Sequence, residues 1–216
     1  MTLTITLIII IITVIVSVSA FSNEKILNDL IFYPPAVTNN KQWYRFFTCG
    51  LIHADFIHLA FNMYALYLFG RNVEEYFVYI FQEKGKLLYL LMYILSLIAC
   101  LLPTYMRHKR DSHYRSLGAS GAVSAVIFAS IMLEPERGIG FVFIPGIFIP
   151  GFVFGLLYLI ISTYLDKRGG GNINHSAHIW GALFGIAFLI GASYMLSDYN
   201  VLELFVTRVQ RYIQSF

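Results

Sequence analysis

The chain has 216 residues, of which 58% are hydrophobic and only 12% are charged, with a net charge of +3 at pH 7. Because a typical soluble domain carries about 25% charged residues, this composition excludes an ordinary soluble protein and indicates a membrane protein. The positive charge is spread over short segments, with no basic run longer than RHKR. It therefore predicts no nucleic-acid partner.

Six apolar segments that approach the length needed to cross a bilayer follow one another along the chain. They predict an all-α membrane protein, a six-transmembrane-helix bundle in a single domain of residues 1–200. The predicted helices are Leu3–Val18, Phe56–Phe69, Leu87–Leu102, Leu117–Leu133, Gly151–Leu165 and His178–Met195. The charged segments between them are interpreted as interfacial loops.

The two ends of the chain allow separate predictions. The first apolar segment ends in a Ser-x-Ala pattern that resembles a signal-peptide cleavage site, but no Lys or Arg precedes it. A retained helix is therefore favoured over a cleaved signal peptide. Residues 201–216 have apolar side chains at a helical period with Arg208 and Arg211 elsewhere, which predicts an amphipathic helix on the membrane surface.

Cys49 and Cys100 lack metal-ligand spacing, and we expect no structural disulfide.

Four polar residues lie near the starts of even-numbered apolar segments: His58 and Asn62 in the second, Ser120 in the fourth and His178 in the sixth. Successive membrane helices alternate in direction, so these three segments begin on one side of the membrane. The four residues are therefore predicted to converge at one depth. Any one of them alone is explained equally well as a structural residue, and Ser120 alone is better explained in that way. Polar groups that converge within a membrane bundle, however, mark a functional site.

The sequence GASG places Ser120 between small residues where a loop becomes a predicted helix. Backbone N–H groups at a helix start are unpaired and stabilise a nearby oxyanion. After His178, Gly181 and Gly185 have the small-xxx-small spacing that lets membrane helices pack with their backbones close together. Close packing of the fourth and sixth helices would bring the His178 imidazole to Ser120 as the base that a serine nucleophile requires.

His58 and Asn62 are four residues apart and therefore lie on one face of the second predicted helix. Both side chains can donate a hydrogen bond to an oxyanion, alongside the Ser120 N–H. The carboxylates lie in predicted loops, at helix ends or in the tail, with none placed to orient His178. The pattern thus predicts a Ser-His dyad that needs no metal or cofactor.

These segments resemble the rhomboid family of intramembrane serine proteases over about Trp43–Gly191. The resemblance is carried, in family order, by WYRFFTCGLIHADFIHLAFNMYALYLFG, GASG and AHIWGALFG. It implies a rhomboid-like bundle in which Ser120 is the nucleophile, His178 the general base, and His58 and Asn62 the oxyanion donors. The family's serine protease activity is directed at peptide bonds in or beside transmembrane helices.

The resemblance has two further implications and one departure. Residues Trp43–His53 are similar to the family's membrane-embedded first loop, with Arg45 in a structural role. The segment IPGFVFGLLYLIISTY is similar to the family's fifth helix, whose movement is thought to admit substrate. At Ser124 the chain departs from family members that have a tyrosine there, packed on the catalytic histidine.

By resemblance, the partners are membrane-protein substrates whose transmembrane segments contain helix-weakening residues, with a small residue before the cut. Two alternatives are a catalytically inactive relative that binds or escorts membrane proteins, and a small transporter or channel. The family habit in bacteria places the amino terminus in the cytoplasm and the site outside the inner membrane. Nine of the 15 Lys and Arg residues would then lie outside, which runs mildly against the positive-inside rule.

Overall fold

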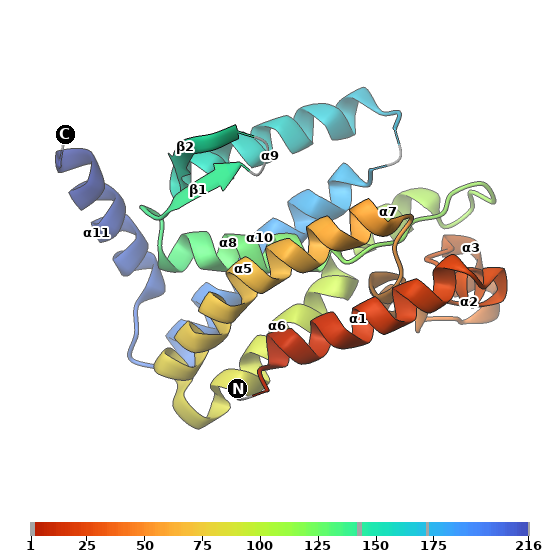
Figure 1. Cartoon of the computed structure of the whole chain (residues 1–216), viewed down its shortest axis with the longest axis horizontal. Coiled ribbons are helices and arrows are strands. Elements are labelled where there is room, and N and C mark those ends of the chain that lie inside the picture. Colours follow the sequence, from red (N-terminus) through yellow and green to blue (C-terminus); the bar gives the residue numbers. More distant parts are fainter. Residues whose placement is uncertain (1–2, 142–143, 172, 216) are drawn as a thin grey trace.

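The fold is seen in a computed structural model that describes residues 3–141, 144–171 and 173–215. It is mostly helical, with the longer helices packed side by side (Figure 1). The elements are α1 (Ile5–Phe21), α2 (Glu24–Leu30), α3 (Pro34–Asn40), α4 (Arg45–Thr48), η1 (Cys49–Leu51), α5 (Phe56–Phe81), η2 (Gln82–Lys84), α6 (Gly85–Ala99), α7 (Leu102–His108), α8 (Ser120–Leu133), β1 (Gly138–Phe141), β2 (Ile144–Pro150), α9 (Gly151–Arg168), α10 (His175–Leu196) and α11 (Val201–Gln214).

Each of the six predicted apolar segments forms a helix, and the largest error in their bounds concerns α5. That helix continues to Phe81 instead of ending at Phe69, so the interpretation of residues 70–81 as a loop was wrong. Its added turns contain Glu74, which is buried and accepts hydrogen bonds from Ile5 N (2.8 Å) and Thr6 N (2.9 Å) at the start of α1. The carboxylate is tolerated inside the bundle because the unpaired N–H groups of a helix start surround it.

Polar contacts also join the far part of α1 to the rest of the bundle. Ser17 is fully buried, and its hydroxyl donates to Leu51 O (2.8 Å) and lies 3.0 Å from His53 Nδ1. His53 and Glu74 therefore both have partners in α1, and α1 is part of the packed bundle.

The connection between α8 and α9 contains strands that an all-α prediction did not include. Strands β1 and β2 form an antiparallel hairpin in which Ile139 pairs with Ile149 and Gly140 with Phe148. The Phe148 ring lies over Gly140, where an added Cβ would come within 2.9 Å of it. The short helices of the other connections, α2, α3, α4 and α7, were likewise predicted as loops.

Helix α8 forms the centre of the bundle, since nearly all of its residues are buried and it packs against α5, α6 and α10. Its closest neighbour is α10. A Cβ added at Gly181 would collide with the backbone of Gly121, and one added at Gly185 with the backbone of Ala125. The two backbones are therefore in contact, as the small-xxx-small spacing predicted.

Helix α9 is attached differently at its two ends. At its start, Gly151 N donates to Arg137 O (2.9 Å) and Phe152 N to Pro135 O (2.9 Å). Beyond its last residue, Gly169, Gly170 and Gly171 all have positive φ angles. Among its described residues, α9 buries only Gly151, Gly155 and Ser162, so it is less embedded than α1, α5, α6, α8 and α10.

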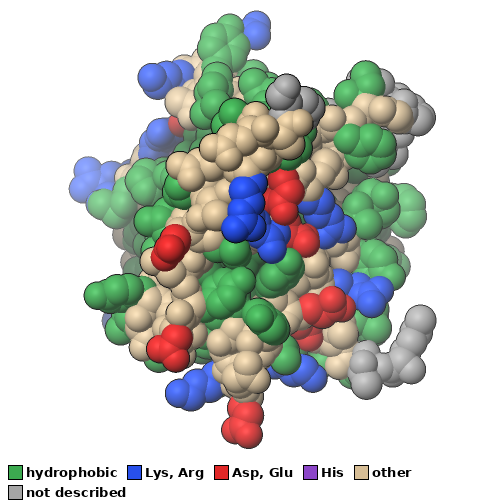
Figure 2. Space-filling model, turned by 90° about the vertical axis from the view of Figure 1, so that its left-hand side faces the viewer, with side chains coloured by type: hydrophobic (Ala, Val, Ile, Leu, Met, Phe, Trp, Pro, Cys, Tyr) green, Lys and Arg blue, Asp and Glu red, His purple; other side chains and the backbone are tan. Residues whose placement is uncertain are grey.

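The predicted amphipathic tail is a helix, α11, although Phe216 lies outside the described residues. Arg208 of α11 pairs with Glu136 (3.0 Å), and the Tyr212 ring lies 5.8 Å from that of Phe152. Figure 2 views the end of the molecule that carries α11, and side chains of both charges gather there amid hydrophobic ones. The helix therefore docks on the bundle through one face.

Within the described residues, two helical stretches are long and apolar enough to cross a membrane by length and composition alone. They are Phe56–His108 and His175–Leu196. The first stretch reverses at Gln82, where φ is +52°, and so supplies the packed pair α5 and α6. The helices Ile5–Phe21 and Ser120–Leu133 are apolar but shorter.

Candidate active site

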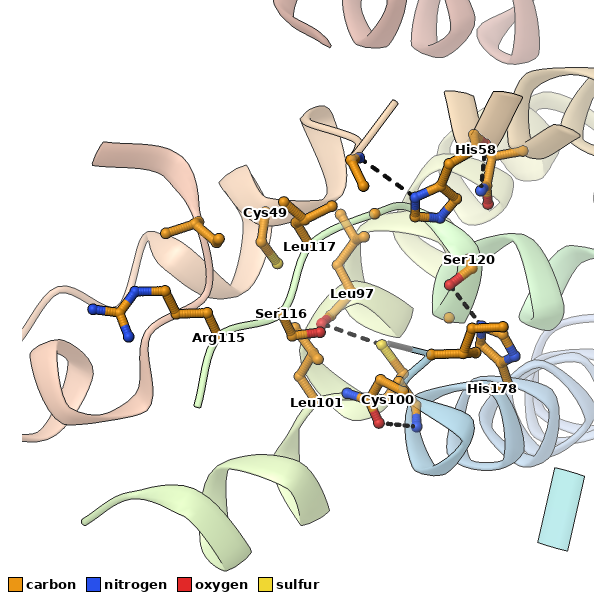
Figure 3. Close-up of a pocket in the computed structure, with 18 of the residues that line it drawn as sticks. Cys49, His58, Leu97, Cys100, Leu101, Arg115, Ser116, Leu117, Ser120 and His178 are labelled. Carbon is orange, nitrogen blue, oxygen red and sulfur yellow. Dashed lines mark hydrogen bonds between the residues drawn. The ribbon is translucent and has the colours of Figure 1, made fainter. Parts of the chain in front are cut away.

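A cavity of about 600 Å³ lies at the end of the bundle where α5, α8 and α10 begin. All four predicted site residues line it: His58, Asn62, Ser120 and His178. Figure 3 shows Ser120 between the two histidines. Residues up to 120 positions apart in the sequence are thus brought together, as the alternation of helix direction predicted.

The connection before α8 and the connection after α9 meet at this same end. Arg107 pairs with Asp166 (3.5 Å). Thr104 and Asn174 exchange hydrogen bonds of 3.1 and 3.3 Å. Asn174 also caps α10 by accepting from Ala177 N (3.0 Å), which fixes the first turn of the helix that carries His178.

The shortest contact between site residues joins His178 Nε2 and Ser120 Oγ, at 2.7 Å. A neutral imidazole with its proton on Nδ1 accepts the serine hydroxyl proton at Nε2. Because α8 begins at Ser120, the backbone N–H of this residue belongs to the first helical turn, where N–H groups lack partners inside the helix. Ser120 therefore supplies two groups to the site: a hydroxyl beside a base, and a backbone N–H donor.

His58 lies against the loop that precedes Ser120. Gly118 has a φ of +110°, and a Cβ there would lie only 2.7 Å from His58 Cε1 and 3.0 Å from Nε2. Both the positive φ and the lack of room for a Cβ therefore require glycine at position 118. Ala54 N donates to His58 Nδ1 (3.5 Å), so the neutral ring carries its proton on Nε2, the nitrogen beside Gly118.

Asn62 lies one helical turn further along α5 than His58 and is buried. Its Nδ2 donates to His58 O (3.0 Å), which uses one of the two amide hydrogens. The second hydrogen remains for a group in the cavity that Asn62 lines. Two donors of α5 thus face the space beside Ser120.

His53 lies next to the site and was not among the site residues predicted from the sequence. Ala119 N donates to His53 Nε2 (3.3 Å), so Nδ1 carries the proton and donates to Ser17 Oγ (3.0 Å). Burial lowers the pKa of His53 to about 3, which keeps the ring neutral. His53 therefore ties the residue before Ser120 to α1. The available signal was a second histidine, besides His58, in the segment CGLIHADFIH.

Arg45 holds the segment that leads to His53. It is buried, and its guanidinium donates to Asn28 O (2.8 Å), Ile31 O (2.6 Å) and Gln42 Oε1 (2.6 Å). These acceptors belong to the connection between α1 and α4. Contacts of this kind are those of a structural residue, the role that the resemblance implied.

The arrangement has the parts needed for acyl transfer by a serine: a hydroxyl in contact with an imidazole, and several N–H donors around the same cavity. Among the described residues, the ion pairs that involve histidine are limited to His108 with Asp111, away from this cavity. Ser120 and His178 thus form a hydrogen-bonded pair, and no carboxylate among the described residues is paired with His178.

Residues 40–195 match the rhomboid domain. Similar proteins include Rhomboid-like protein 11, chloroplastic, of Arabidopsis thaliana (31% identical; 70% of this chain, 53% of that protein), and Rhomboid protease GlpG of Enterobacter sp. (29%; 72% and 50%). Presenilin-associated rhomboid-like protein, mitochondrial, of Rattus norvegicus is 29% identical over 63% of this chain and 35% of its own length. This chain thus spans about half or less of these three relatives, which belong to bacteria, chloroplasts and mitochondria. The chain belongs to the rhomboid family of membrane proteins.

Proposed function

We propose that the chain is an intramembrane serine endopeptidase that works through a dyad of Ser120 and His178. The observation that carries this proposal is the 2.7 Å contact between Ser120 Oγ and His178 Nε2 inside a cavity rimmed by N–H donors. As the hydroxyl attacks a substrate carbonyl carbon, its proton passes to Nε2. The same proton is then given to the leaving amine, and an acyl-enzyme remains.

The negative charge that develops on the carbonyl oxygen is received by the Ser120 N–H, His58 Nε2–H and the second hydrogen of Asn62. Water then attacks the acyl-enzyme with His178 again as the base, which releases the new carboxylate and restores the Ser120 hydroxyl. None of these steps requires a metal or cofactor. The chain supplies every proton donor and acceptor of the cycle except the water.

The membrane setting that we propose has six crossings, formed by α1, α5, α6, α8, α9 and α10. Helix α8 has 14 residues and is about 21 Å long, shorter than a hydrocarbon core of about 30 Å. A helix of this length, centred in the bundle, starts below the membrane surface, so the cavity above Ser120 is open to water from one side.

We further propose the inner membrane of a bacterium, with the amino terminus in the cytoplasm and the cavity facing outward. Cysteine-accessibility labelling tests this topology. Residues 107–115 and 167–174 should label from one side, and residues 82–86 from the other. Labelling of the first two segments from opposite sides would contradict the six-crossing arrangement.

The proposed substrates are membrane proteins whose transmembrane segments contain helix-weakening residues. A helical segment shields its peptide bonds through its own hydrogen bonds, so it must be opened locally before Ser120 can reach a carbonyl carbon. The cavity volume of about 600 Å³ accommodates a short extended segment rather than an intact helix, whose diameter is about 10 Å.

A fluorophosphonate probe tests the proposed function directly. The purified protein in detergent should be labelled at Ser120 and should cleave a reporter transmembrane substrate. Ser120→Ala and His178→Ala should abolish both activities with little change in melting temperature, because each removes a member of one catalytic unit. His113→Ala, at an exposed histidine outside the cavity, is the matched control and should behave as the parent. A folded parent that neither labels nor cleaves would instead indicate a binding or escort protein.

A further inference from the structure

Helix α9 approaches the candidate active site along one stripe of small residues. Gly155 and Ser162 are buried, and Tyr158 lies between them on the same face. A Cβ added at Gly155 would lie 3.3 Å from both Phe128 and Ile131 of α8. The absent side chain thus lets α9 come close to α8 one turn before Tyr158.

The Tyr158 hydroxyl is connected to the backbone of Ser120 through Ser124. Ser124 Oγ donates to Ser120 O (2.8 Å) and lies 2.8 Å from Tyr158 Oη. A serine hydroxyl has a single proton, so Tyr158 must be the donor in the second bond. The two bonds form a chain from α9 to the carbonyl of the residue whose hydroxyl faces His178.

The Tyr158 ring also limits the space beside His178. The two ring centroids are 6.3 Å apart and their planes are inclined by 26°, within the range of aromatic pairs. The Tyr158 ring also lies 5.5 Å from the ring of Phe128. The phenol is therefore close both to a core side chain of α8 and to the imidazole.

We propose that Tyr158 is a positioning residue for Ser120 and His178, and that the pair is fully aligned only while α9 is seated on α8. The inference rests on the proposed function and deepens it. Tyr158 acts on Ser120 through Ser124, and on His178 through ring contact. It touches no reacting atom, so its loss should change the alignment of the pair rather than the binding of substrate.

Variants at positions 158 and 124 separate the ring from the hydroxyl. Tyr158→Leu removes both, and should lower kcat and the rate of fluorophosphonate labelling about ten-fold with little change in KM. Tyr158→Phe keeps the ring and should lose about three-fold. Tyr158→Phe combined with Ser124→Ala should be no slower than Ser124→Ala alone, because both changes break one chain of hydrogen bonds. Tyr164→Leu, at a residue of α9 that is 62% exposed, is the control and should match the parent.

A readout that does not need activity keeps this inference distinct from the proposed function. In protein labelled with ¹⁵N-histidine, the parent should show His178 as one tautomer protonated at Nδ1, and Tyr158→Leu should shift it toward a tautomer mixture. Parent-like turnover, labelling, pH profile and His178 spectrum in a folded Tyr158→Leu protein would overturn the inference. Should Tyr158→Leu not fold, additive losses in the Tyr158→Phe and Ser124→Ala cycle would overturn it. A parent that never labels contradicts the proposed function, and the His178 spectra still decide the role of Tyr158.

Discussion

Replacing Gly181 by alanine tests the close packing that brings His178 to Ser120. The added Cβ would collide with the Gly121 backbone of α8. Backbone atoms cannot rotate away as a side chain would, so α10 has to shift as a whole. Because His178 lies one turn before Gly181 on α10, this shift should also lengthen the contact between the imidazole and the Ser120 hydroxyl.

The expected magnitude follows from two opposing effects. Overpacking by one carbon atom costs about 1–3 kcal/mol in a well-packed core. The lower conformational entropy of an unfolded alanine returns about 0.4–1 kcal/mol. Taken at mid-range, the net loss is about 1.3 kcal/mol, which corresponds to a melting temperature lower by about 3–5 °C for a chain of this size.

Gly191→Ala is the matched control, since it lies in the same helix and, apart from its chain neighbours and the nearby backbone of α10, no described atom comes within 4 Å of a Cβ added there. This substitution should raise the melting temperature, because only the entropic gain applies. The assay is thermal unfolding in detergent, followed by the fluorophosphonate labelling rate. If Gly181→Ala stabilised the protein as Gly191→Ala does, the backbone contact between α8 and α10 would be refuted.

Three more predictions concern single residues. Asn62→Ala should lower kcat by up to about a hundred-fold with KM and melting temperature near the parent, as for an oxyanion donor; a lower melting temperature with normal turnover would show a structural residue instead. The pKa of His53 is about 3 in the folded chain against about 6.5 when unfolded, so the unfolded state binds the extra proton and about 2 kcal/mol of stability should be lost between pH 7 and 5. Pulse proteolysis across this range should show a flatter profile for His53→Gln, and an unchanged profile would argue against a neutral buried ring. Glu74→Ala should destabilise the protein by about 3 kcal/mol because it leaves N–H groups of α1 unpaired, while exposed Glu75→Ala should stay within about 0.5 kcal/mol; equal effects in thermal unfolding would contradict the role of Glu74.

The sequence predicted the helices well where burial alone decides them, as in the almost wholly buried α8. It failed at the end of α5, because the partners of Glu74 lie in α1, 68 and 69 residues away. Judged from its sequence neighbours alone, such a carboxylate indicates a loop. The hairpin of β1 and β2 was missed because its apolar run lacks the strict alternation that distinguishes a half-buried strand.

The candidate site was predictable to the extent that its residues interrupt apolar helices. His58, Ser120 and His178 stand out there as polar groups, and the alternation of helix direction places them together. Tyr158 gave no such signal, since an aromatic residue in a membrane helix is common and the sequence does not say which face meets α8. Ser124 drew attention only as a departure from the family. Its bond to Tyr158 spans 34 residues and becomes visible only in three dimensions.

Backbone hydrogen bonds hold the start of α9, whereas its last turn is held by the partly exposed ion pair of Asp166 with Arg107, so the helix can pivot near Gly151 once that pair opens. Tyr158 lies about 10 Å along the helix from this point and Arg168 about 26 Å. A tilt that moves the far end by about 5 Å therefore moves Tyr158 by about 2 Å, enough to break its 2.8 Å bond to Ser124. A small sideways opening at the far end would thus disturb the bond between Tyr158 and Ser124, and under the proposed function hydrolysis would require α9 to be seated again on α8.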